Sequence, residues 1–159
     1  VVNLSRLARE AAAAVFPLAD GAGRKLAVDL PDTLAVRGNS EDLRDMIRNL
    51  LDNALIHGCG EIRLVAGVEA EAGNARLVCI TVSDEGAGVP EALGETVFDR
   101  FRKGSPESSG HGLGLAIVRE IARGHDGHVA FEPGRPCRIN VTLPMANEAV
   151  SVARMDDEI

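Results

Sequence analysis

The sequence predicts an α+β fold, a two-layer sandwich in which helices pack on one face of a mixed sheet. Some segments have apolar residues at helical spacing, and others alternate apolar and polar residues as strands do. Their order along the chain is helix, strands, helix, hairpin, loop, helix and hairpin. The chain has 159 residues, the size of one domain, and no repeat or linker divides it. With 45% hydrophobic and 26% charged residues, its composition excludes a disordered protein.

The first half of the chain shows two helices and two short strands. Apolar residues at helical spacing predict a helix over residues 4–20, and the alternating stretches "KLAVDL" and "LAVRG" predict strands. Asn39 and Ser40 are both good N-cap residues for the second helix. That helix is expected to run to about His57, with Gly58 at its C-cap.

The second half begins and ends with paired strands. "EIRLVAGVEA" and "ARLVCITVSD" predict a hairpin, and "HVAFEP" and "CRINVTLP" predict the closing strands. Between them we expect a loop-rich segment over 87–109 with a brief helix at 95–101, then a helix over 113–122. Periodicity is lost after the last strand, which predicts a domain over residues 1–146 and a C-terminal tail over 147–159.

Charge and cysteine usage exclude several classes of function. The formal net charge is −7, no basic stripe occurs and the four aromatic residues are all Phe, which argues against nucleic-acid binding. The three cysteines lack metal-binding spacing and are typical of buried thiols in a reducing cytosol. No apolar run approaches about 18 residues, so we expect a cytoplasmic domain. A chain that opens with Val1 is expected to be cut from a longer protein.

The stretch "DEGAGV" combines an acid with two glycines at the end of an alternating strand. Asp84 can accept a hydrogen bond from an exocyclic amine in an apolar pocket, where an unpaired amine would cost about 1–3 kcal/mol. Gly86 and Gly88 allow the backbone to approach a flat ligand. Taken alone, the stretch is also typical of a turn that leaves a strand.

A second glycine cluster, "GHGLGL", precedes an apolar helix pattern. Free N–H groups at a helix start can bind phosphate oxygens. The cluster is not a Walker A loop, because no Gly-Lys-Ser or Gly-Lys-Thr occurs, and Leu115 stands where the dinucleotide pattern requires a third glycine. By itself, the cluster also fits a tight loop.

Two asparagines four residues apart lie in "RNLLDNALIHG". Asn49 and Asn53 share one helix face, where half-buried neutral amides are costly unless they find partners. The carbonyl oxygen of Asn53 is a hard ligand suited to a Mg²⁺ ion that is otherwise held by water and phosphates. A buried Asn bound to a water is the structural alternative.

Together these stretches resemble the catalytic ATP-binding domain of two-component sensor histidine kinases, in the Bergerat-fold (GHKL) superfamily. "NLLDNA" is similar to the N box, "DEGAGV" to the first glycine box, "FDRF" to the F box and "GHGLGLAIV" to the second glycine box, in the family's order. The resemblance covers roughly residues 3–144. It implies binding of ATP with Mg²⁺ and transfer of the γ-phosphoryl group.

The resemblance also implies a role for each matching residue. Asp84 would take the adenine amine in a pocket shaped by Gly86 and Gly88, Asn53 would hold Mg²⁺, and Asn49 would lie near the γ-phosphate. The further residues implied in nucleotide binding are Arg102 and Lys103 of a lid over 102–109 anchored by Phe98 and Phe101, the glycine-box residues Gly110, Gly112, Leu113, Gly114 and Leu115, His57 after the N box, and Thr142 with Asn140 on the last strand.

The sequence departs from the family in two respects. Ile56 and His57 stand where the family often has a basic residue and Tyr, so charge neutralisation from Ile56 is impossible. None of the four histidines, His57, His111, His125 and His128, combines a following acid with a proline a few residues on in a helix. The phosphoacceptor is therefore expected on a dimerisation domain upstream or in trans, and a response regulator is expected as an indirect partner. A cytoplasmic domain of this kind is compatible with a membrane-anchored parent protein.

Three alternatives share the fold. An anti-sigma-type serine kinase regulator would phosphorylate a serine of an antagonist. A gyrase-type or mismatch-repair-type ATPase would need an acid near the N box to activate water, and Asn49 disfavours it. A degenerate docking module without nucleotide is left open by Ile56, although Asn53 and Asp84 are intact.

Overall fold

The computed structural model describes residues 1–69, 75–87, 109–132 and 134–146. Its elements, in chain order, are β1 (Val2–Asn3), α1 (Leu4–Gly21), β2 (Leu26–Asp29), β3 (Ala35–Val36), α2 (Ser40–His57), β4 (Ile62–Glu69), β5 (Leu77–Asp84), α3 (Ser109–Gly124), β6 (His128–Glu132) and β7 (Cys137–Pro144). The brief helix expected at 95–101, the lid residues 102–108 and the tail 147–159 lie outside the described ranges.

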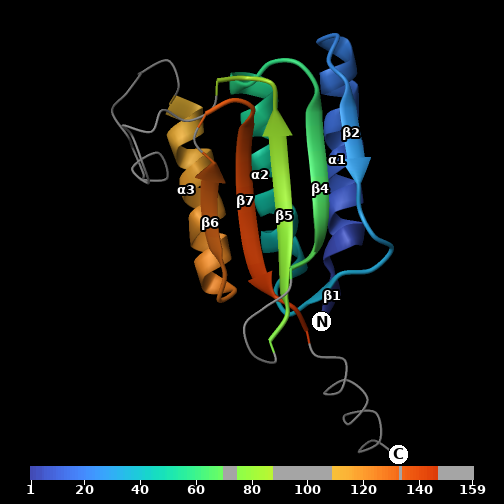
Figure 1. Cartoon of the computed structure of the whole chain (residues 1–159), viewed down its shortest axis with the longest axis vertical. Coiled ribbons are helices and arrows are strands. Elements are labelled where there is room, and N and C mark those ends of the chain that lie inside the picture. Colours follow the sequence, from blue (N-terminus) through green and yellow to red (C-terminus); the bar gives the residue numbers. More distant parts are fainter. Residues whose placement is uncertain (70–74, 88–108, 133, 147–159) are drawn as a thin grey trace, which may run out of the picture.

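Five of the strands form one mixed sheet in the order β2-β4-β5-β7-β6. β2 and β4 are parallel, and every other neighbouring pair is antiparallel. The helices of the described residues, α1, α2 and α3, lie on one face of this sheet, behind it in Figure 1. The predicted α+β sandwich is confirmed, and both predicted hairpins are present.

The core lies between the sheet and the helices because alternate strand residues point to opposite faces. In β5, Val78, Ile80 and Val82 are buried, and the same alternation continues to Asp84. The strand therefore carries one ionisable group toward the helix side, at its last position.

Hydrogen bonds at the helix ends follow the expected capping pattern. Asn39 is the N-cap of α2, where its Oδ1 accepts from the Asp42 N–H at 3.0 Å, and Gly58 is the C-cap. Asn3, which was not predicted as a cap, accepts from the N–H groups of Ser5 and Leu34, each at 3.1 Å. This side chain fixes the start of α1 to the segment before β3.

The "LAVRG" stretch contains a strand, as predicted: β3 pairs with β1 in a two-stranded ribbon apart from the main sheet. One feature differs from the prediction. Helix α3 begins at Ser109, four residues before the expected start, although glycine has a low helix propensity. α3 packs against α2, and near its start Gly114 faces Asn49.

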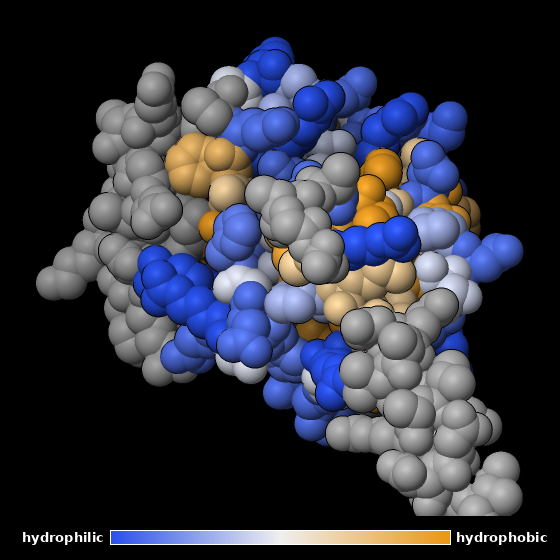
Figure 2. All heavy atoms as spheres, turned by 60° about the horizontal axis from the view of Figure 1, so that its bottom comes forward, coloured by the Kyte–Doolittle hydropathy of each residue, from blue (hydrophilic) through white to orange (hydrophobic). Residues whose placement is uncertain are grey.

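The end of the molecule turned forward in Figure 2 shows apolar patches separated by hydrophilic side chains. Across the described residues, the exposed large apolar side chains are Val1, Phe16, Leu18, Val28, Ile56, Val65 and Val68. None of the helices in the described ranges has the length and hydropathy of a membrane span.

Candidate functional site

A buried carboxylate lies at the end of β5. Asp84 is 4% exposed, and the other buried polar residues in the described ranges, Ser5 and Thr142, are not charged. Its Oδ1 accepts from the Gly86 N–H at 2.7 Å, in the manner of an Asx turn. A buried carboxylate is costly unless it is hydrogen-bonded, so this position favours a ligand that brings another donor.

Two glycines pack directly against this carboxylate. A Cβ atom at Gly86 would stand 2.7 Å from Asp84 Oδ1, and a Cβ atom at Gly58 would overlap the carboxyl group and lie 2.6 Å from the Ala54 carbonyl oxygen. Gly58 has φ −85°, which any residue adopts, so close approach is what requires glycine there. The sequence had predicted Gly58 only as a helix cap.

Cys137 is the neighbour of Asp84 in the sheet, and the sequence analysis did not single it out as a site residue. The two residues pair in the β5–β7 register. Burial, followed by the charge of Asp84 and hydrogen bonding to it, raises the pKa of the Cys137 thiol to about 11. The thiol is therefore protonated beside the carboxylate at neutral pH.

The structure does not bring Thr142 to Asp84. Thr142 pairs with Cys79, five residues before Asp84, so an odd number of positions puts it on the opposite face of the sheet. Asn140 is on that face too and accepts from the Thr81 hydroxyl at 2.7 Å. The strand register gives the place beside Asp84 to Cys137 instead.

The two asparagines of α2 are both half-buried, as their spacing predicts. The Asn49 Nδ2 donates to the Asp45 carbonyl at 2.8 Å, and its Oδ1 lies 3.3 Å from where a Cβ atom of Gly114 would be. Asn49 thus faces the glycine-rich start of α3. No residue within the described ranges forms a hydrogen bond with the Asn53 amide, whose oxygen is available to a ligand.

The start of α3 carries the second glycine cluster. Because the helix begins at Ser109, the unpaired N–H groups of its first turn belong to residues 109–111, whereas the N–H groups from Gly112 to Leu115 donate within the helix. Leu115 is 4% exposed and belongs to the core. Gly110 is therefore better placed than Gly112 or Leu115 to offer its N–H group to an anion.

The remaining predicted site residues have different outcomes. Gly88, Arg102 and Lys103 lie outside the described residues. His57 is exposed at the last position of α2, and Ile56 beside it is 64% exposed. Within the described ranges, no three acidic, His or Cys side chains form a metal-binding group, so a metal there would depend on few protein ligands.

The elements that carry these residues meet at one end of the molecule. β5 ends, α2 ends and α3 begins at the top of Figure 1. The site thus combines a buried acceptor for a polar donor, glycines that permit close approach, a free amide oxygen, and a helix N-terminus that favours anions. This combination suits a ligand in which a flat base carrying an exocyclic amine is linked to a chain of phosphates.

Comparison with known proteins agrees with this chemistry. Residues 38–147 match the family described as histidine kinase-, DNA gyrase B-, and HSP90-like ATPase. The sensor histidine kinase MtrB of Mycobacterium tuberculosis is 34% identical over 154 residues, which cover 91% of this chain and 26% of MtrB. The sensor-type histidine kinase PrrB of the same organism is 37% identical over 115 residues, covering 70% of this chain and 25% of PrrB. The chain thus spans about a quarter of these relatives.

Solved structures show the same architecture. Full-length ShkA in complex with AMPPNP superposes with a TM-score of 0.75 at 26% identity, covering 92% of this chain and 31% of ShkA. The catalytic domain of histidine kinase ThkA gives a TM-score of 0.76 at 24% identity, covering 90% of this chain and 93% of that domain. At that identity, the likeness to ThkA concerns the fold alone.

Proposed function

Because the chain belongs to the histidine kinase-, DNA gyrase B- and HSP90-like ATPases, we propose that it binds ATP with Mg²⁺ and transfers the γ-phosphoryl group to a histidine outside this chain. The observation that carries the proposal is the buried carboxylate of Asp84, with one oxygen bound to the Gly86 N–H. Its second oxygen is an acceptor for the adenine amine. Guanine has a carbonyl oxygen at the corresponding place and would face the carboxylate unfavourably.

We assign phosphate binding to the start of α3 and to the part of α2 around Asn49 that faces it. Gly110 offers its N–H group at the N-terminus of α3, Gly112 follows it without a side chain that could block the phosphates, and Gly114 gives Asn49 room. We assign Arg102 and Lys103 to the phosphates as cations, with Gly88 beside the base and Leu113 and His57 at the edge of the site.

The Asn53 oxygen suits Mg²⁺, since this ion takes few protein ligands and keeps waters and substrate phosphates around it. When bound, the ion neutralises charge on the phosphates. Phosphoryl transfer proceeds through a loose transition state, so the chain contributes mainly positioning. Asn49 is a neutral amide and orients the incoming group rather than removing its proton.

Calorimetry with ATP and GTP tests the adenine assignment. The Asp84→Asn substitution keeps the shape but leaves one acceptor oxygen for two donors, the Gly86 N–H and the adenine amine. We expect ATP affinity to fall about tenfold to a hundredfold, the range that loss of a buried hydrogen bond of about 1.5–3 kcal/mol gives. Equal affinity of the wild-type chain for the two nucleotides, or unchanged binding in the variant, would contradict the assignment.

The metal assignment is tested by titrating ATP with and without Mg²⁺. Asn53→Ala should remove most of the Mg²⁺-dependent gain in affinity, since alanine cannot reach the ion. Asn140→Ala is the matched control because Asn140 lies on the other face of the sheet. If the Asn53 variant keeps the full Mg²⁺ effect, its amide has a structural role.

The phosphoacceptor is proposed to lie on a helical dimerisation domain, upstream in the parent chain or in trans, with a response regulator downstream of it. The two histidines nearest to an acceptor sequence are not on an exposed helix face: the His125 ring accepts from the Asn39 N–H at 3.1 Å and lies 2.7 Å from the Ile121 carbonyl, and His128 begins strand β6. The chain alone should not autophosphorylate with labelled ATP, and a matched acceptor domain should gain acid-labile label. Label on a serine of a partner would instead support the anti-sigma-type alternative.

A further inference from the structure

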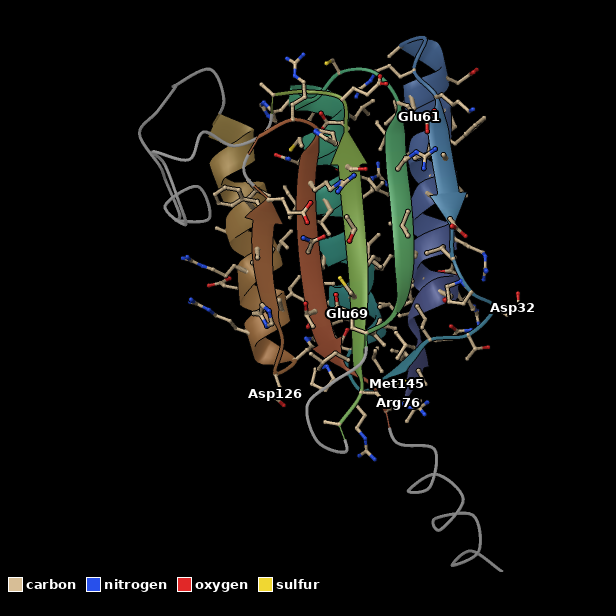
Figure 3. The ribbon with its side chains drawn as sticks, viewed as in Figure 1. Asp32, Glu61, Glu69, Arg76, Asp126 and Met145 are labelled. Carbon is tan, nitrogen blue, oxygen red and sulfur yellow. The ribbon has the colours of Figure 1, made fainter. Side chains whose placement is uncertain are left out.

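The loop between α2 and β4, residues Gly58–Glu61, touches the Asp84 carboxylate. Its first residue, Gly58, packs so closely that a Cβ atom would overlap the carboxyl group. The position of this loop therefore sets the space around Asp84. In Figure 3, Glu61 marks the end of this loop at the start of β4, at the end of the sheet where β5 finishes.

One side of the loop is held by Arg24, from the segment between α1 and β2. Its Nε donates to the Gly60 carbonyl at 2.9 Å, and its Nη1 donates to the Ala54 and Leu55 carbonyls at 3.1 and 2.7 Å. The Ala54 carbonyl also accepts from the Gly58 N–H at 3.0 Å, whereas the Leu55 carbonyl lies in the last turn of α2, where carbonyls lack partners within the helix. A cation there also favours the negative helix end. Arg24 thus joins the end of α2 to the loop.

The guanidinium is embedded rather than free to swing in water. Its Nη2 is buried and has no hydrogen-bond partner in the described part of the chain. The Arg24 main chain is fixed as well, because its N–H donates to the Ala19 carbonyl at 2.8 Å at the end of α1. The loop is therefore tied through Arg24 to the first helix.

The other side of the loop is held by Glu85, the residue after Asp84. The Glu85 N–H donates to the Cys59 carbonyl at 2.9 Å, and its Oε2 accepts from the Glu61 N–H at 2.9 Å. Gly60 has φ +69°, which glycine adopts without strain, and a Cβ atom there would overlap the Glu85 carboxylate. The residue that follows Asp84 is thus hydrogen-bonded to the loop through both its main chain and its side chain.

We propose that Arg24 and Glu85 are positioning residues for nucleotide recognition, which clamp the Gly58–Glu61 loop so that Gly58 holds the Asp84 carboxylate in place. This inference rests on the proposed ATP-binding function. Neither residue needs to touch the nucleotide. Arginine is required on one side because a planar fork bridges three carbonyls of two segments, whereas the lysine ammonium is a point donor.

The test compares Arg24→Met with Arg24→Lys and with a matched control, Arg9→Met. The Arg9 Nη2 also donates to two main-chain carbonyls, those of Leu30 and Pro31, at 3.2 and 2.9 Å, but away from this loop. Affinity for ADP and the ratio of ATP to GTP affinity are measured by calorimetry, at protein concentrations corrected for the folded fraction.

We expect Arg24→Met to bind ADP about tenfold more weakly, the effect of losing about 1.4 kcal/mol of positioning, and to lose part of the preference for ATP over GTP. Arg24→Lys should recover only part of both, and Arg9→Met should match the wild type. On the other side, Glu85→Ala should weaken ADP binding, and Glu85→Gln, which retains an acceptor oxygen, should recover most of it.

The outcomes separate the two proposals. Absence of ADP binding by the wild-type chain would overturn the proposed function. Wild-type ADP affinity and nucleotide preference in folded Arg24→Met would overturn the positioning role, and so would an equal loss in Arg9→Met. Should Arg24→Met fail to fold, the Glu85 pair decides: the inference fails if Glu85→Ala binds ADP as the wild type does, or if Glu85→Gln binds no better than Glu85→Ala.

Discussion

Replacing Gly58 with alanine adds one methyl group at the point where the α2–β4 loop meets the Asp84 carboxylate. The main chain there, φ −85° and ψ −176°, accepts alanine, so the change acts through contact and not through backbone strain. The added Cβ atom would overlap the carboxyl group and lie 2.6 Å from the Ala54 carbonyl oxygen. Either the loop or the Asp84 side chain must move.

The size of the effect of Gly58→Ala on stability and on nucleotide binding depends on how far Asp84 and the loop can shift. Asp84 is short, 4% exposed and bound to the Gly86 N–H at 2.7 Å, and the loop is held by Arg24 and Glu85. Overpacking of this kind costs about 1–3 kcal/mol of folding stability. If the carboxylate turns away, the lost bond to the adenine amine weakens ATP binding by about tenfold to a hundredfold.

Calorimetry with ADP and urea unfolding together provide the assay. The control is Gly67→Ala in β4, where a Cβ atom would meet nothing within 4 Å. This control should bind ADP like the wild type and should be as stable or slightly more stable, because alanine is favoured over glycine within a strand. If Gly58→Ala binds ADP with wild-type affinity while folded, the assignment of Asp84 and its packing against Gly58 is refuted.

Three further predictions concern His125 and the Cys137 thiol. His125→Ala should lower the free energy of unfolding in urea by about 0.5–1.5 kcal/mol, the net worth of an ordinary hydrogen bond, because the exposed Asn39 N–H loses its acceptor; an unchanged urea midpoint would contradict this. Iodoacetamide at about pH 8.5 should modify the exposed Cys59 much faster than Cys137, of which roughly 0.3% is thiolate at a pKa of about 11; equal rates would contradict the shielding of Cys137. Folded Cys137 keeps its proton to about pH 11, whereas the unfolded thiol loses its proton near pH 9.0. The free energy of unfolding should therefore fall as the pH rises from about 9 to 11, and it should fall less in the Cys137→Ser variant.

Features that depend on neighbours in the chain were determined by the sequence alone. Helical spacing placed α1 and α2, and Asn39 and Gly58 marked the ends of α2, because capping bonds join residues a few positions apart. Strict alternation in β5 put Asp84 on the helix side of the sheet. The paired amides of α2 followed from the spacing of four residues.

The contacts around Asp84 were decided only by tertiary structure. Thr142 suited the adenine pocket by residue type, but the β5–β7 register places Cys137 beside Asp84 and turns Thr142 to the other face. Arg24 is 30 residues or more from the three carbonyls that it binds, and nothing in the local pattern signals this contact. Helix α3 likewise extends over glycines that local propensity disfavours, where it packs against α2. Strand register and helix packing join segments far apart in sequence, so their energies are fixed only when the whole core forms.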